Sequence, residues 1–137
     1  MWASPQIDER DVAEASRQGF ALIINNRPDG EADDQPAGEV IERAAREAGL
    51  DYCAIPITHA GFSRSQVEEM ASALESASGP VLAYCRSGTR STLLWALARS
   101  RSGDPAHEVA EAAHAAGYDV SSIRAVMDMF SSASDGR

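Results

Sequence analysis

Short apolar runs alternate with stretches of helical periodicity along most of the chain. Continuous apolar runs of strand length occupy residues 20–24 (FALII), 52–57 (YCAIPI) and 81–84 (VLAY). Elsewhere apolar side chains recur at helical spacing, which predicts helices over residues 5–18, 39–48, 63–78, 89–100, 104–117 and 123–130. Strands that alternate with helices form parallel βαβ units. We therefore expect an α/β protein with a small, mostly parallel sheet and helices on both faces.

Polar residues and prolines at the ends of these segments predict where several of them begin and end. Asp8 is placed to cap the first helix, and Ser63 with Gln66 has the spacing of a capping box. Pro56 has no N–H for a sheet ladder, so it marks the end of its strand or a sheet edge. Gly79 ends the helix that begins near Ser63, and the next strand follows directly.

Three loops follow the predicted strands, and a ligand site is expected among them. In open α/β sheets ligands gather at the carboxyl ends of the strands. Here those ends are residues 25–31, 58–62 and 85–90. The last of these loops contains a cysteine, a glycine and two arginines just before an apolar helix. It is therefore the first place to look for chemistry.

The composition is that of an ordinary globular protein of one domain. The chain has 137 residues, of which 44% are hydrophobic and 24% charged, and this suits a single core. We expect one domain over residues 1–130 and a flexible tail over 131–137. No stretch approaches the roughly 18 apolar residues of a membrane span, and no signal-like segment opens the chain. A cytoplasmic location is the resulting expectation.

The net charge narrows the range of partners. A net charge of −9 argues against a general affinity for nucleic acid or anionic membrane, because both require clustered Lys and Arg. An anion site in this protein must therefore be local. The two cysteines, Cys53 and Cys85, lack the density that is typical of disulfide-rich secreted domains. We interpret both as reduced thiols, with Cys53 as a small core residue of its strand.

The segment around Cys85 combines a strand end, a tight loop and a helix N-terminus. The first N–H groups of a helix have no partner within the helix and favour an anion. The same N–H groups and the helix dipole stabilise a nearby thiolate and lower its pKa. Gly88 lets the loop turn without a Cβ clash. These features predict that Cys85 is a nucleophile beside an anion site; the alternative is a buried structural thiol.

Polar side chains surround the predicted nucleophile. Arg90 is expected to act with Cys85 in catalysis, as a forked donor to an anion, while Arg86 adds local positive field. Donors of the loop complete the predicted anion site, which contains Arg86, Ser87, Gly88, Thr89 and Ser91.

The two neighbouring loops supply further candidates. His59 is placed either to donate a proton or orient a substrate, or simply to lie in an exposed loop. Arg27, Asp29 and Glu31 lie at the end of the first predicted strand, where they can shape the rim of a pocket. Because this segment is also a turn sequence, we expect a structural role for Asp29 and a substrate contact for Arg27.

Parts of the sequence resemble two known families. The segment YCRSGTRS (84–91) is similar to the active loop of single-domain rhodaneses, sulfurtransferases that carry sulfur as a cysteine persulfide. The segments ALIINNRPDGE and EAGLDYCAIPI, followed by the cysteine loop, resemble the dual-specificity-phosphatase layout. They are most similar to the phosphatase-like domain of beta-lactamase-hydrolase-like proteins. This second resemblance covers roughly residues 3–100 and implies a cysteine-phosphatase-like fold.

The sequence departs from the phosphatase pattern in two ways. Phosphatases of this type have five residues between the cysteine and the arginine, whereas four separate Cys85 from Arg90. They also supply an aspartic acid from the loop after the IPI-like strand to protonate the leaving oxygen. The corresponding loop here, THAGFSRSQ (58–66), has no carboxylate. A shorter loop has fewer N–H groups for three phosphoryl oxygens, and sulfur transfer needs no protonated alkoxide, so both departures favour sulfur over phosphorus.

We therefore expect a sulfurtransferase. Cys85 would attack a sulfane sulfur of thiosulfate, a persulfide or a similar small-molecule donor, and a thiol or cyanide would accept that sulfur. The resemblance to rhodaneses implies a Cys85 persulfide, and no metal or organic cofactor is implied. One alternative is a protein-tyrosine or dual-specificity-type phosphatase that forms a phosphocysteine. A second alternative is a non-catalytic module that binds phosphate or sulfate; the oligomeric state is left open.

Overall fold

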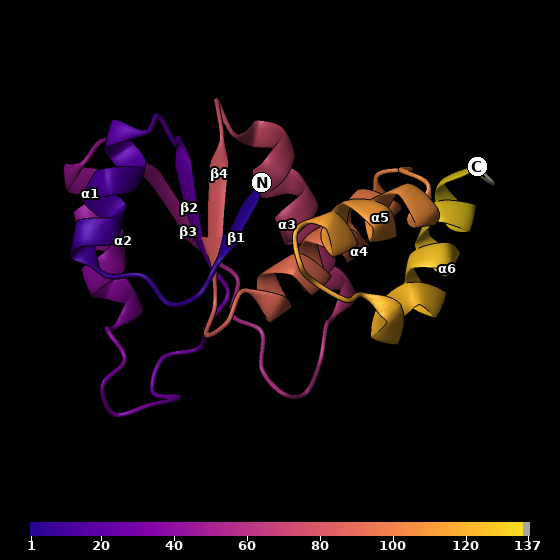
Figure 1. Ribbon diagram of the computed structural model, residues 1–137, viewed down its shortest axis with the longest axis horizontal. Helices are drawn as coiled ribbons and strands as arrows, with labels where there is room; N and C mark the ends of the chain where they lie inside the picture. The colour runs from indigo at the N-terminus through magenta and orange to yellow at the C-terminus, as the bar shows by residue number, and fades with distance from the viewer. Residues whose placement is uncertain (136–137) are drawn as a thin grey trace. The chain divides into compact units, whose positions relative to one another are not determined.

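The computed structural model of the protein describes residues 1–135, which form one four-stranded sheet and six α-helices (Figure 1). The strands are β1 (Trp2–Ser4), β2 (Leu22–Asn25), β3 (Asp51–Ala54) and β4 (Val81–Tyr84). The helices are α1 (Glu9–Arg17), α2 (Gly38–Glu47), α3 (Arg64–Ser76), α4 (Thr89–Arg101), α5 (Ala106–Ala115) and α6 (Arg124–Asp135), with a short 3₁₀ turn, η1 (Ser121–Ile123). The prediction of an α/β fold is confirmed.

The chain divides into two compact units, which we describe separately. The first unit contains residues 1–61 and 73–91, and the second contains residues 62–72 and the described residues from Thr92 onward. The sheet, α1, α2 and the loop that holds Cys85 all belong to the first unit. A single domain over residues 1–130 stays a prediction.

All four strands of the sheet are parallel, in the order β1-β4-β2-β3. β4 and β2 are therefore inner strands, and the loops that leave them have neighbours on both sides. Ile23 and Ile24 of β2 and Ala83 of β4 are all at 0% exposure, which explains their continuous apolar pattern. Pro56 lies beyond the end of β3, which is an edge strand, so the position predicted for a residue without an N–H is confirmed.

Strand β1 is the element that the sequence pattern does not reveal. It has three residues, and Trp2 is 58% exposed, so no apolar run marks it. It pairs with β4, with Trp2 opposite Leu82 and Ser4 opposite Tyr84. The ring of Trp2 also packs edge-on against Phe20, with ring centroids 5.2 Å apart. Backbone pairing with β4 and the contact between Trp2 and Phe20 therefore hold this strand in the sheet.

Helix α1 begins later than predicted. The sequence pattern starts it at Pro5, whereas the structure starts it at Glu9, because the preceding residues connect it to β1. The predicted cap is confirmed. Asp8 Oδ1 accepts the N–H of Asp11 at 2.9 Å, and Asp11 Oδ2 accepts the N–H of Asp8 at 3.0 Å.

Helices α1 and α2 lie side by side on one face of the sheet (Figure 1). Val12 of α1 and Ile41 of α2 are fully buried, and they share one hydrophobic cluster with Ile23 of β2. Burying an aliphatic side chain of this size stabilises a fold by about 1.5–3 kcal/mol. This layer keeps β2 in place, and therefore also the loop that follows it.

The second unit is helical. It includes residues 64–72 of α3. This helix begins with the predicted capping box: the N–H of Ser63 donates to Gln66 Oε1 at 2.8 Å, and the N–H of Gln66 donates to Ser63 Oγ at 3.2 Å. Helices α5 and α6 pack against each other. Helix α6 continues to Asp135 and so includes residues 131–135, while the flexibility expected of residues 131–137 stays a prediction. Residues 136–137 lie outside the described part of the chain.

Candidate active site

The Cys85 loop, residues 85–90, connects β4 to α4 at the carboxyl edge of the sheet. Backbone hydrogen bonds from both neighbouring strands set its starting point. The N–H of Cys85 donates to the carbonyl of Ser4 at 3.3 Å, and the N–H of Asn26 donates to the carbonyl of Tyr84 at 2.8 Å. Because the loop leaves an inner strand, its first residue is held from two sides.

Cys85 is fully buried, at 0% exposure, and the N–H of Gly88 donates to its Sγ at 3.1 Å. Burial raises the pKa of the Cys85 thiol. The backbone N–H groups of Ser91, Ser87 and Gly88 and the nearby Ser91 hydroxyl lower it by more, so the net pKa shift is downward. The thiolate is therefore stabilised by N–H groups at the start of a helix, as the sequence predicts.

Gly88 is required by the path of the loop. Its φ is 92°, in the left-handed region, where a residue with a Cβ costs roughly 1–2 kcal/mol. In this conformation its N–H faces Sγ of Cys85. The glycine thus serves the hydrogen bond to the thiol as well as the turn.

Arg90 makes three hydrogen bonds with its terminal nitrogens. Nη1 donates to Glu31 Oε2 at 2.7 Å and to the carbonyl of Ile57 at 2.8 Å, and Nη2 donates to Glu31 Oε1 at 2.8 Å. The side chains of Arg90 and Glu31 are only 19% and 22% exposed. Glu31 raises the pKa of Arg90, and a smaller attraction to Cys85 acts in the same direction. The predicted fork is present, but in this structure it holds a carboxylate of the protein itself.

Arg27 contacts the same carboxylate. Its Nε donates to Glu31 Oε1 at 2.9 Å, and its Nη1 donates to Gln6 Oε1 at 3.1 Å. The side chain is only 6% exposed. The structure therefore brings Arg27 to the site and engages its guanidinium with protein groups, while direct contact with a substrate stays a prediction.

Gln6 is a site residue that sequence analysis misses. Besides its contact with Arg27, its N–H donates to the carbonyl of Arg86 at 3.4 Å. It lies in the short connection after β1, where neither periodicity nor a motif distinguishes it. Only the pairing of β1 with β4 brings it to the Cys85 loop.

Glu31 is ionised throughout the neutral range. Its hydrogen bonds to Arg90 are the main cause that lowers its pKa to about 2; partial burial acts against them and Arg27 assists. A carboxylic acid with this pKa cannot hold a proton at neutral pH and cannot give one to a leaving group. Glu31 therefore acts in the site as a fixed negative charge.

Comparison with known proteins identifies the family. Residues 1–102 match the family described as the phosphatase-like domain of beta-lactamase hydrolase-like protein. The chain belongs to this family. A beta-lactamase hydrolase-like protein of Xylella fastidiosa is 37% identical over 106 residues, which are 77% of this chain and 25% of the relative. The chain thus spans about a quarter of the length of that relative.

Solved structures agree with this assignment. A Neisseria meningitidis protein described as a candidate phosphatase is 35% identical to this chain. The two structures superpose with a TM-score of 0.80, over 93% of this chain and 90% of the other. A kinase-associated phosphatase in which serine replaces the catalytic-site cysteine has a TM-score of 0.72 at 15% identity, and the match covers 98% of this chain and 84% of the other. At that identity it shows the fold alone. The cysteine-phosphatase-like fold is confirmed, and the likeness of the loop to rhodaneses stays a prediction.

The loop after β3 brings His59 toward the site of this phosphatase-like domain. The carbonyl of Ile57 accepts a hydrogen bond from Arg90, and His59 follows shortly after it as an exposed residue. The loop closes on itself through the N–H of Gly61, which donates to the carbonyl of Thr58 at 3.2 Å. Both predicted roles of His59, as a proton donor or as an exposed loop residue, are compatible with this position.

The remaining residues of the predicted anion site fall into two groups. Arg86, Ser87 and Thr89 are exposed, and Ser87 Oγ donates to Thr89 Oγ1 at 3.0 Å. Ser91 is fully buried and lowers the pKa of the Cys85 thiol. The loop therefore presents an outer surface of charge and hydroxyls and an inner lining of N–H groups.

Asp29 has the structural role predicted for it. Its Oδ1 accepts the N–H of Gly38 at 2.8 Å, at the start of α2. It also lines a pocket of about 240 Å³, together with Glu39, Glu42 and Tyr52. Three carboxylates on one pocket disfavour an anionic ligand, so this pocket does not compete with the Cys85 loop as an anion site.

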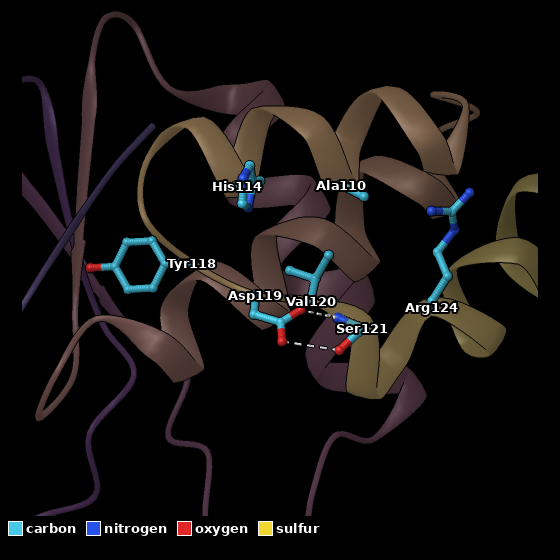
Figure 2. A pocket seen from close by; sticks show the side chains of 7 residues that line it. All are labelled: Ala110, His114, Tyr118, Asp119, Val120, Ser121 and Arg124. Carbon is cyan, nitrogen blue, oxygen red and sulfur yellow. Dashed lines mark hydrogen bonds between the residues drawn. The ribbon is translucent and has the colours of Figure 1, made fainter.

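A further pocket lies wholly within the second unit (Figure 2) and has a volume of about 160 Å³. Both carboxylate oxygens of Asp119 are engaged there by Ser121, whose N–H donates at 2.9 Å and whose Oγ donates at 3.1 Å. His114 and Arg124 line the same pocket. The hydrogen bonds of Asp119 stabilise the start of η1, which is a structural role.

Among residues 1–135, no group of three or more His, Cys, Asp or Glu side chains is arranged to hold a metal ion. In the same part of the chain, none of the helices combines the length and the apolar character that crossing a bilayer requires.

Proposed function

We propose that this domain is a sulfurtransferase in which Cys85 is the nucleophile. The Cys85 thiolate attacks the outer sulfur of a sulfane donor, and a new S–S bond forms. The S–S bond within the donor breaks, and its electron pair leaves with sulfite, a sulfinate or a thiolate. A thiol or cyanide then attacks the persulfide, takes the outer sulfur and releases the Cys85 thiolate.

The observation that supports this reaction is that neither Glu31 nor the loop of residues 58–66 offers a carboxylic acid beside the activated thiol. Glu31 is ionised, with a pKa of about 2, and the loop of residues 58–66 has no carboxylate. Hydrolysis of an ordinary phosphate ester needs an acid to protonate the leaving alkoxide. Sulfite and sulfinates are stable anions and leave without a proton, so sulfur transfer fits the residues that are present.

The size of the Cys85 loop supports the same choice. Four residues separate Cys85 from Arg90, and the N–H groups of Ser87, Gly88 and Ser91 act on the sulfur itself. A persulfide adds one atom to the thiol, whereas a phosphocysteine adds a phosphorus with three oxygens that each need donors. The donors of this loop are thus better matched to the smaller group.

Phosphomonoester hydrolysis through a phosphocysteine is the second candidate. The family is described as phosphatase-like, and the Neisseria protein is described as a candidate phosphatase. These comparisons favour the phosphatase over sulfur transfer. We expect such an activity to favour esters whose leaving group needs little protonation, such as activated aryl phosphates.

Intact-protein mass spectrometry distinguishes the two reactions. The protein is incubated with thiosulfate, with an organic thiosulfonate, or with an aryl phosphate, and the adduct on Cys85 is identified. Sulfur transfer predicts a gain of one sulfur atom, which a Cys85→Ser variant does not show and a Cys53→Ser variant keeps. A phosphoryl adduct on Cys85 without any sulfur adduct would replace sulfur transfer by the phosphatase. A protein with no adduct from any donor would be a binding module.

A further inference from the structure

The fork of Arg90 is already occupied by a carboxylate of the protein. A guanidinium has five N–H donors, and hydrogen bonds to Glu31 and to the carbonyl of Ile57 use three of those on Arg90. An anion that enters the Cys85 loop therefore meets an arginine whose positive charge is balanced by Glu31. The loop supplies N–H donors to the anion, but little net positive charge.

We propose that Glu31 makes the Cys85 loop selective for singly charged anions, so that the sulfur donor is an organic thiosulfonate or persulfide in preference to a doubly charged donor. This inference rests on the proposed sulfur transfer, because it names the class of donor. It also predicts a preference among anions that do not react, and that preference can be measured separately.

The charges around the loop explain the selectivity. Arg90 and Arg27 both pair with Glu31, and Arg90 also attracts the Cys85 thiolate, so the two guanidiniums together balance the negative charges of Glu31 and the ionised thiol. A second negative charge on the ligand is therefore repelled by Glu31 and gains no compensating cation within the buried part of the site. Arg86 is exposed, where water and salt screen its charge.

Glu31 is held in a way that resists displacement. Arg90 binds both of its oxygens, and Arg27 binds Oε1 from a position that is only 6% exposed. A dianion that took the fork of Arg90 would leave Glu31 paired with Arg27 alone, and the carboxylate would face the dianion across a partly buried site, where like charges repel strongly. The Glu31 carboxylate therefore stays in place and repels doubly charged anions more strongly than singly charged ones.

The chemistry of a singly charged donor is balanced without further reagents. With methanethiosulfonate, Sγ of the Cys85 thiolate attacks the terminal sulfur of the donor. The S–S bond to the sulfonyl sulfur breaks, and its electron pair leaves with methanesulfinate. Cys85 becomes a persulfide anion, and neither a proton nor an oxidant is consumed.

Two unreactive anions test the preference directly. Methanesulfonate and sulfate differ by one methyl group in place of one charged oxygen. The rate at which iodoacetamide alkylates Cys85 is measured at increasing concentrations of each anion. A Cys53→Ser background is used, so that the measured rate belongs to Cys85 alone. We expect methanesulfonate to protect Cys85 from alkylation at a lower concentration than sulfate. In Glu31→Gln we expect the ratio of the two protecting concentrations to shift by about tenfold in favour of sulfate.

A matched control removes a carboxylate of the same type elsewhere in the first unit. Glu14 pairs with Arg17 at 2.7 Å on the surface of α1, so Glu14→Gln should leave the ratio unchanged. The ratio is informative because a general change in the reactivity of Cys85 affects both anions alike. Stronger protection by sulfate in the unaltered protein, an unchanged ratio in Glu31→Gln, or no protection by either anion would each overturn the proposal.

The reactive donors give the corresponding kinetic test. The values of kcat/KM for methanethiosulfonate and thiosulfate are compared in the unaltered protein and in Glu31→Gln. We expect the variant to gain about tenfold for thiosulfate relative to methanethiosulfonate. If neither donor transfers sulfur, the proposed function fails, while the protection ratio still decides whether Glu31 selects anions by charge.

Discussion

Both carboxylate oxygens of Glu31 accept hydrogen bonds from Arg90, at 2.7 and 2.8 Å, across 59 positions of sequence. The two residues meet because β2 and β4 are adjacent and parallel, so that the loops leaving them emerge at the same edge of the sheet. The pair ties the loop after β2 to the Cys85 loop. It therefore affects both the stability of the protein and the chemistry of its thiol.

The pair should make stability depend on pH in the acid range. The pKa of Glu31 is lowered in the folded protein from 4.5 to about 2. A lowered pKa contributes stability that is fully present above pH 4.5 and is lost as the pH falls toward 2. The two side chains keep 19% and 22% exposure, so solvent partly screens the pair. We therefore expect the pair to contribute about 1–2 kcal/mol to the free energy of unfolding at neutral pH, less than the full pKa shift implies.

Urea unfolding of Glu31→Gln at neutral and acid pH measures this contribution. The variant should be less stable than the unaltered protein at pH 7, and the two should converge near pH 2 to 3. Glu14→Gln, which breaks an exposed pair with Arg17, should have a smaller effect at both pH values. A Glu31→Gln deficit that is the same at both pH values would show that the carboxylate charge contributes nothing.

Replacing Arg90 by lysine should separate charge from geometry. An ammonium keeps the positive charge but cannot bind both oxygens of Glu31 and the carbonyl of Ile57 in the planar arrangement of a guanidinium. Loss of charge-assisted hydrogen bonds should slow sulfur transfer by about ten- to a hundredfold. Alkylation of Cys85 should persist, because backbone N–H groups stabilise its thiolate. Unchanged transfer kinetics in a folded Arg90→Lys protein would remove Arg90 from the site.

Cys85 should react as a thiolate at a pH where ordinary thiols do not. Hydrogen bonds from the loop lower its pKa, so its alkylation rate should titrate below the value of about 8.5 that is typical of a free cysteine. Peptide mapping after iodoacetamide treatment across a pH series gives the rates of Cys85 and Cys53 in one experiment. Denaturing the protein should abolish the difference. Equal rates in the folded state would argue against activation of Cys85.

The leaving group should govern any phosphatase activity. Without a carboxylic acid in residues 58–66 and with Glu31 ionised, the site has no carboxyl group to protonate an alkoxide. An activated aryl phosphate should therefore be hydrolysed much faster than an alkyl phosphate. Phosphate release from both esters is compared with thiocyanate formation from a sulfane donor and cyanide. Efficient hydrolysis of the alkyl ester with no sulfur transfer would make the phosphatase the better assignment.

The sequence by itself determined the features that depend on neighbours along the chain. The cap at Asp8 and the capping box at Ser63 were predictable because a cap joins residues within one helical turn. The surroundings of the Cys85 thiol along the chain were predictable for the same reason. A strand, a glycine turn and a helix N-terminus meet within a few residues, and together they direct N–H groups at Cys85.

Only the tertiary structure decided what surrounds that thiol. Strand β1 has too few residues to show a pattern, so Gln6 reaches the site through pairing with β4 alone. The partner of Arg90 could equally have been a substrate, because sequence spacing does not say which groups share an edge of the sheet. The order of the parallel strands brings Glu31 to Arg90. Since charges interact through space, that placement sets the electrostatics of the loop, which no local pattern records.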